Sequence, residues 1–210
     1  MLLFLLLLIP VSLIVYVIIR KDRSVILPVF AGLITAVVVC ACRFFFTYEH
    51  RLIYNSFSEN LIYYLVKQSF LPLVVVSAVY ALISRDNAQF KVNNFFPLLG
   101  TFFAVYLPYC VITSSEFYYQ AYDIFLKPVI YLAMLVMISF CLKNGWNSIT
   151  SKNMFFAALN ILIIVVYAFY PAVSDALYAI NYNFAIILII GLVYSLIPFA
   201  LFVIRQIRNK

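Results

Sequence analysis

Seven apolar stretches, each long enough to cross a bilayer, fill almost the whole of this 210-residue chain. A helix rises about 1.5 Å per residue, so roughly 20 residues span the hydrocarbon core of a membrane. The runs are continuous rather than alternating, which argues against the strands of a membrane barrel. Because lipid offers the backbone no hydrogen bonds, the pattern predicts helices. We expect an all-α, seven-helix transmembrane bundle, a single domain over residues 1–210, with spans at 2–19, 24–46, 61–84, 95–114, 121–142, 153–172 and 183–204.

The composition excludes a water-soluble globule. Hydrophobic residues make up 67% of the chain and charged residues 10%, whereas soluble domains are about half apolar and a quarter charged. The net charge of +7 lies in the loops between spans rather than on one face, so we expect no nucleic-acid partner. The expected partner is the lipid bilayer, with other membrane subunits or a small anionic solute as further candidates.

The charges between the spans predict the orientation. Basic residues stay on the cytoplasmic side of a membrane, which places the N-terminus outside and the C-terminus inside. The loops opposite the basic side hold Arg51 together with Glu49, Glu59, Glu116 and Asp175. The loops after the first, third and fifth spans, with the C-terminal tail, hold ten basic residues, namely Arg20, Lys21, Arg23, Arg85, Lys91, Lys143, Lys152, Arg205, Arg208 and Lys210. These four basic segments share one side only if there are seven spans.

Three basic residues, Arg43, Lys67 and Lys127, lie inside the expected spans and near their outer ends. A lone charge at bilayer depth costs about 2.5–3.5 kcal/mol on insertion scales. One interpretation is a shared polar pocket that opens to the outside. The other is snorkelling, in which a long stem lifts the charge to the headgroups. Snorkelling is favoured for Arg43, and both interpretations stay open for the two lysines.

Two neighbours of these lysines support the pocket interpretation. Asp123 lies four residues before Lys127, so on an α-helix the two side chains share a face and can pair. Gln68 follows Lys67 and precedes Pro72 by four residues, and a proline has no N–H for the carbonyl one turn earlier. The predicted ligand-binding residues are therefore Lys67, Lys127, Asp123, Arg43 and Gln68, with an anionic group held between the two lysines.

A stripe of small residues, Gly32, Ala36 and Cys40, predicts a close helix contact. It serves internal packing or a partner subunit, and internal packing is the favoured alternative. The four cysteines all lie in apolar spans and the chain has one histidine, so we expect neither a metal nor a cofactor. We find no motif of the common enzyme classes and predict that the chain is not an enzyme.

These patterns favour a multi-pass protein that binds or translocates a small solute, or the membrane subunit of a transporter. The alternative is a non-catalytic scaffold, assembly factor or sensor that acts through partner helices. Many Phe, Tyr, Ile and Asn residues, and no Asn-x-Ser/Thr site, suit the inner (cytoplasmic) cell membrane of a bacterium. Spans one to three and five to seven have similar lengths and orientation. This order resembles the three-plus-one-plus-three architecture of SWEET sugar exporters, but the Pro-Gln pair of that superfamily is absent, and no family is assigned.

Overall fold

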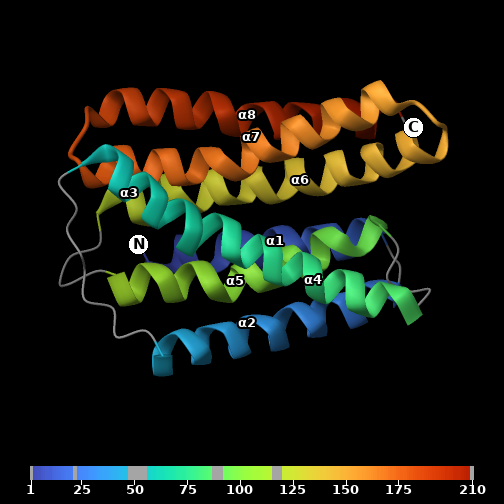
Figure 1. Ribbon diagram of the computed structural model, residues 1–210, viewed down its shortest axis with the longest axis horizontal. Coiled ribbons are helices and arrows are strands. Elements are labelled where there is room, and N and C mark those ends of the chain that lie inside the picture. Colours follow the sequence, from blue (N-terminus) through green and yellow to red (C-terminus); the bar gives the residue numbers. More distant parts are fainter. Residues whose placement is uncertain (1, 21–22, 47–55, 87–91, 115–119, 209–210) are drawn as a thin grey trace. The chain divides into compact units, whose positions relative to one another are not determined.

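The computed structural model describes residues 2–20, 23–46, 56–86, 92–114 and 120–208, and in this part of the chain every regular element is a helix (Figure 1). The all-α prediction is confirmed for these residues. Four short segments depart from α geometry: η1 and η3 are 3₁₀-helices, and η2 and η4 are π-helices. In chain order the elements are α1 (Leu2–Arg20), η1 (Arg23–Val25), α2 (Ile26–Phe46), α3 (Phe57–Tyr64), η2 (Leu65–Phe70), α4 (Leu71–Asp86), η3 (Val92–Asn94), α5 (Phe95–Ser114), η4 (Tyr122–Leu126), α6 (Lys127–Thr150), α7 (Met154–Ala179) and α8 (Phe184–Arg208).

Several of these helices are long and apolar enough to cross a membrane, so the chain is a helical, multi-pass membrane protein. Within the described residues there are six such segments: Ile26–Phe45, Phe57–Arg85, Phe95–Thr113, Tyr122–Thr150, Met154–Ala179 and Phe184–Leu201. The expected first span corresponds to α1, whose apolar part Phe4–Ile19 is shorter than the others. The count of seven therefore stays a prediction.

The helix ends differ from the predicted span ends, and one difference matters for function. Asp175 was expected in an outer loop, but it lies inside α7 and is only 3% exposed. Glu59, expected in another outer loop, lies in the first turn of α3. Hydropathy marks where a helix meets lipid, whereas a helix continues as long as its backbone groups are paired, whether its polar side chains are buried, as Asp175 is, or exposed, as Glu59 is. Among the other residues used for the orientation, six lie outside the described residues, namely Lys21, Glu49, Arg51, Lys91, Glu116 and Lys210.

The chain forms two compact units. The first unit is Met1–Ile53 with Leu71–Pro128, and the second unit is Tyr54–Phe70 with Val129–Lys210. This division does not follow the two three-span segments 2–84 and 121–204. It passes instead inside two spans, Phe57–Arg85 and Tyr122–Thr150.

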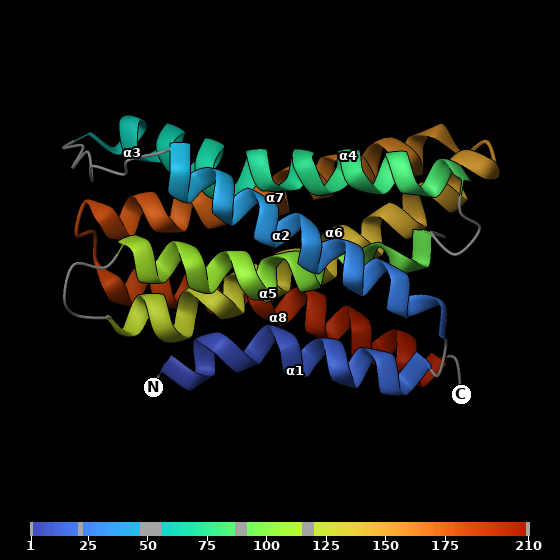
Figure 2. The same cartoon turned by 90° about the horizontal axis from the view of Figure 1, so that it is seen from below.

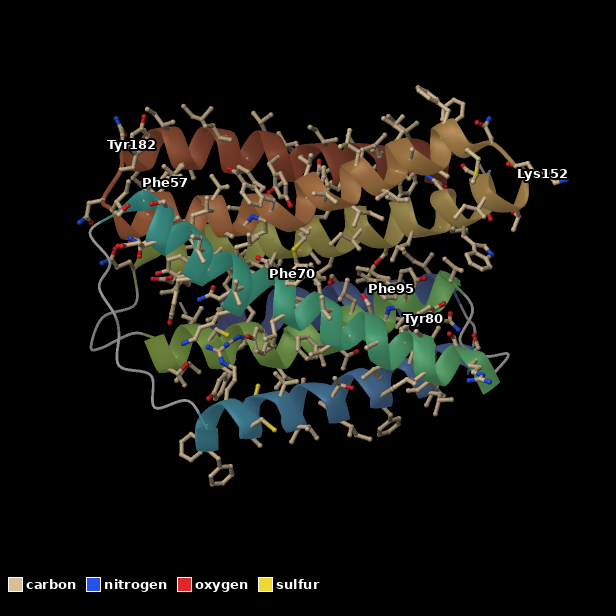
Figure 3. The ribbon with its side chains drawn as sticks, in the orientation of Figure 1. Phe57, Phe70, Tyr80, Phe95, Lys152 and Tyr182 are labelled. Carbon is tan, nitrogen blue, oxygen red and sulfur yellow. The ribbon has the colours of Figure 1, made fainter. Side chains whose placement is uncertain are left out.

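The core of the first unit is α5, on which α1, α2 and α4 pack (Figure 2). Its buried side chains include Leu98, Phe102 and Phe103, each 0% exposed. Tyr80 of α4 meets Phe95 of α5 edge to face, with ring centroids 5.2 Å apart (Figure 3). Large aromatic side chains thus fill the space between the helices of this unit.

The small-residue stripe of α2 lies partly against α5. A Cβ built on Gly32 would overlap the carbonyl oxygen of Leu98 and would lie 3.1 Å from the Cβ of Thr101. Ala36 is 0% exposed, and Cys40, one turn further, is half-buried. Glycine at position 32 therefore allows the two backbones to approach closely within the first unit.

In the second unit α3 and η2 pack on α7, and α7 packs on α8. Tyr167 and Tyr194 bond reciprocally, because each hydroxyl donates to the other residue's backbone carbonyl oxygen, at 3.3 and 2.8 Å. Their rings stack with centroids 4.4 Å apart. These contacts fix the register of α7 relative to α8.

The close approach at Gly32 gives a stability prediction. Gly32→Ala should lower the unfolding free energy by about 1–3 kcal/mol, as overpacking does, because the new methyl group meets backbone that cannot move aside. Gly145→Ala is the matched control, since a Cβ there lies 3.5 Å from the Cβ of Asn160, an ordinary contact. The measurement is thermal unfolding of both variants in detergent. Equal melting temperatures for the two variants would contradict the close contact.

Candidate functional site

Polar side chains are buried together in the second unit, among helices that are otherwise apolar. Gln68 on η2, Tyr131 on α6 and Asp175 on α7 are 5%, 1% and 3% exposed. With Ser69, which follows Gln68 and is 0% exposed, we call these four residues the polar cluster. Ionisable groups within membrane spans are rare and commonly mark functional sites.

A local departure from α geometry positions Gln68 and Ser69. Both are the buried residues of the π-helix η2, which ends two residues before Pro72. Pro72 has no N–H to offer the Gln68 carbonyl one turn earlier, so the regular α pattern is interrupted here. Short π-helical segments within α-helices recur at functional sites, because they turn side chains to faces that an α-helix would not present.

Asp175 occupies the most buried part of α7. The buried residues around it are small: Pro171, Ala172, Ser174 and Ala176. Small residues let a neighbouring helix come close, and α3, η2 and α8 all pack on α7 in this unit. The carboxylate therefore faces protein rather than lipid.

The Tyr131 hydroxyl joins the other two elements of the cluster. Its oxygen lies 3.4 Å from Gln68 Oε1 and 3.4 Å from Asp175 Oδ2. Both separations are longer than the usual 2.7–2.8 Å of an O–H···O bond. A single hydroxyl proton therefore serves two acceptor oxygens here.

The Ser69 hydroxyl is the one buried side-chain polar atom without a hydrogen-bond partner among the described residues. Other hydroxyls in these helices bond to a carbonyl one turn earlier, as Thr101 does to Pro97, Ser139 to Leu135 and Ser195 to Gly191. That back-bond depends on α geometry, and η2 is a π-helix. A buried hydroxyl therefore remains available beside Gln68.

Lys67 lies in the same unit and on the same π-helix. Its ammonium donates to the Tyr63 hydroxyl at 3.2 Å and lies 4.6 Å from the centre of that ring. Tyr63 is four residues earlier, so the side chain runs back toward the N-terminal end of its span. This is the direction that snorkelling requires, and the tyrosine ring also stabilises the charge through a cation–π contact.

Lys127 and Asp123 belong to the first unit. Lys127 is the first residue of α6 and is 4% exposed, and Asp123 lies half-buried in η4. The Lys127 N–H bonds to the Tyr122 carbonyl, five residues earlier, so the α-helical stacking assumed for Asp123 and Lys127 does not describe the backbone at this turn. Their pairing, and a pocket shared with Lys67, stay predictions.

Arg43 is held between α2 and α5 in the first unit. It donates to the Tyr106 hydroxyl and, at 3.1 Å, to Cys110 Sγ. Its guanidinium carbon lies 5.3 and 5.9 Å from the ring centres of Tyr106 and Tyr109. Aromatic rings and a hydroxyl thus receive this charge, which links α2 to α5 near the ends of both helices.

The sequence pointed to Gln68 but missed Tyr131, Ser69 and Asp175. Asp175 was assigned to a loop, because small and polar residues surround it and make this stretch less hydrophobic than the rest of the span. The available signal was its position between alanines and serine, the residue types of close helix contacts. Among the described residues, no group of three His, Cys, Asp or Glu side chains is placed to hold a metal ion.

Comparison with protein-family models, with curated proteins and with solved structures gives no match for this chain.

Removing one oxygen atom tests the cluster. Tyr131→Phe takes away the one donor that Gln68 Oε1 has among the described residues, and one donor from Asp175. Leaving a buried acceptor unpaired costs about 1–3 kcal/mol. Thermal unfolding in detergent should show this loss. Tyr182→Phe is the control, because Tyr182 is 47% exposed in the turn after α7 (Figure 3). If both variants unfold at the wild-type temperature, the hydroxyl contributes nothing and the cluster is not a bonded unit.

Proposed function

We propose that this membrane protein binds a small polar solute and moves it across the bilayer, and that the polar cluster is its contact site. The observation that carries the proposal is the buried Asp175 carboxylate, linked through the Tyr131 hydroxyl to the π-helix that holds Gln68. Broken or irregular transmembrane helices with polar groups at membrane depth are the usual places where transporters bind.

The proposed orientation puts the N-terminus of the chain outside, seven spans across the membrane with α1 as the first, and the C-terminus inside. Asp175 then lies four residues from the outer end of α7, and Gln68 lies eleven residues from Phe57, the outer end of its span. These positions are about 6 and 17 Å along the helices. In this orientation the cluster lies in the outer half of the membrane, and we propose that it opens outward.

The Asp175 side chain favours a ligand that brings hydrogen-bond donors, because a carboxylate accepts and does not donate. The Gln68 amide and the Ser69 hydroxyl both donate and accept, so they can also bind hydroxyl groups. Within this proposal, an anionic solute of the kind expected from Lys67 and Lys127 is not recognised at the carboxylate, because like charges repel. The contacts are non-covalent, and we propose that the protein is not an enzyme. The membrane that we propose is the inner membrane of a bacterial cell.

The alternative, a scaffold that acts through partner helices, has less support. Its main sequence evidence was the stripe of Gly32, Ala36 and Cys40. Gly32 packs on Leu98 and Thr101 of α5, within the same unit, so the most crowded position of the stripe is used internally.

Solute binding can be tested without knowing the solute. Purified protein in detergent would be screened for thermal stabilisation by neutral polyols, amines and anions. A ligand at 100 times its Kd adds about 2.7 kcal/mol. Asp175→Asn should abolish the shift produced by the best amine or polyol, because the amide lacks the charge and half of the acceptor sites. Uptake of that compound into proteoliposomes then tests movement.

The matched control for this screen is Glu59→Gln, the same chemical change at an exposed acid of the same unit. It should leave the stabilisation intact. A shift that survives Asp175→Asn, or a hit list made only of anions, would contradict the cluster as the solute site.

The proposed orientation has its own test on the turns at the two ends of α7. Ser151→Cys should be shielded from an impermeant thiol reagent in intact cells, and Tyr182→Cys should react, since these exposed residues lie at opposite ends of the helix, as the labelled Lys152 and Tyr182 do in Figure 3. The unmodified chain, with its four cysteines in apolar helices, gives the background. Labelling of position 151 alone would invert the topology.

A further inference from the structure

The chain passes from one compact unit to the other inside two membrane spans, and both passages have the same local construction. One lies between Phe70 and Leu71, directly after the π-helix η2 and just before Pro72. The other lies between Pro128 and Val129, two residues after the π-helix η4 ends. In both cases a π-helix and a proline fall at the boundary of the units.

Proline alone does not explain this coincidence. Four other prolines, Pro10, Pro108, Pro171 and Pro198, lie inside helices that stay α-helical around them. Each of these four helices belongs to a single unit. Only Pro72 and Pro128 directly follow a π-helix, so the π-helices are associated with the unit boundaries and not with proline in general.

A π-helix followed by a proline weakens the backbone hydrogen bonding of a helix, so the helix bends more easily there. The proline cannot donate to the carbonyl one turn earlier, which is that of Gln68 for Pro72 and of Ile124 for Pro128. The π-helix shifts neighbouring backbone bonds from four-residue to five-residue spacing, as the Lys127 N–H to Tyr122 carbonyl bond shows. Bends in long helices concentrate at such positions.

We infer that η2–Pro72 and η4–Pro128 form a pair of hinges about which the two units move as rigid bodies. Hinges of this kind absorb a change of backbone angles in a few residues while the bodies on either side stay intact. Rocking of one helical bundle against another is how many transporters expose a site first to one side of the membrane and then to the other.

The first hinge also connects this motion to the polar cluster, and this link rests on the proposed function. η2 contributes Gln68 and Ser69, whereas Asp175 belongs to α7. η2 lies at the edge of the second unit, next to the hinge, and Gln68, Tyr131 and Asp175 move together with that unit. A solute bound at Gln68 or Ser69 that fits one conformation of the adjoining backbone better therefore shifts the hinge toward that conformation.

Distances between spin labels test the hinges directly and need no solute. Labels introduced as unnatural amino acids leave the native cysteines in place. One pair joins Thr113 of the first unit to Tyr182 of the second, and a control pair joins Ser151 to Tyr182 within the second unit; all three positions are exposed. We expect two populations for the pair between units and one for the control pair.

The variant that carries both Pro72→Ala and Pro128→Ala should collapse the two populations into one while the protein still elutes as a folded species. Pro198→Ala, a change of the same kind within α8, should leave both populations in place. One narrow population in the wild type, or the same collapse with Pro198→Ala, would overturn the inference.

A second measurement uses the wild type alone, so it tests the hinges even if the double variant fails to fold. Amide hydrogen exchange of the wild type should be faster at residues 65–72 and 122–130 than in the rest of the same two spans. Equal protection along each span would overturn the hinges. Because neither measurement uses a ligand, failure of solute binding at Asp175 and failure of the hinges give separate results.

Discussion

In a membrane every backbone N–H and carbonyl must find its partner within the protein, and the rest of this structure depends on that constraint. It makes each apolar run a helix and leads hydroxyls such as those of Thr101, Ser139 and Ser195 to bond to their own helix. It also makes the exceptions informative. The π-helices η2 and η4 are the interruptions of this pattern within the described spans, and they lie beside Gln68, Ser69 and Lys127.

Tyrosine is the common partner of the ionisable groups inside the helices. Tyr106 receives Arg43 in the first unit, while Tyr63 receives Lys67 and Tyr131 contacts Asp175 in the second. A phenol suits this role because its ring packs like an apolar side chain and its hydroxyl both donates and accepts. The aromatic residues of this chain therefore do more than mark the membrane interface, since these three tyrosines stabilise charged side chains within the helices.

The polar cluster and the hinges depend on the same element. η2 presents Gln68 and Ser69 to the second unit and is also the last segment before the chain enters the first unit. A single local irregularity thus combines a buried polar surface with a soft point in the backbone. In a protein proposed to move a solute, this combination connects occupancy of the site to motion of the units without any additional domain.

The sequence by itself determined that the protein lies in a membrane, that it is helical and roughly where its spans fall. These properties follow from the length of each apolar run and from the lack of hydrogen-bond partners for the backbone in lipid. It also singled out Gln68, Gly32 and the basic residues within the spans, whose types are unusual or special at their positions. Only the tertiary structure placed Asp175 inside a helix, joined it to Tyr131 across 44 residues of sequence, and joined Tyr131 to Gln68 across 63. Only the structure showed that the turns around Lys67 and before Lys127 are π-helices rather than α-helices. These features depend on which helices pack together, and the period and composition of one segment carry no information about its neighbours.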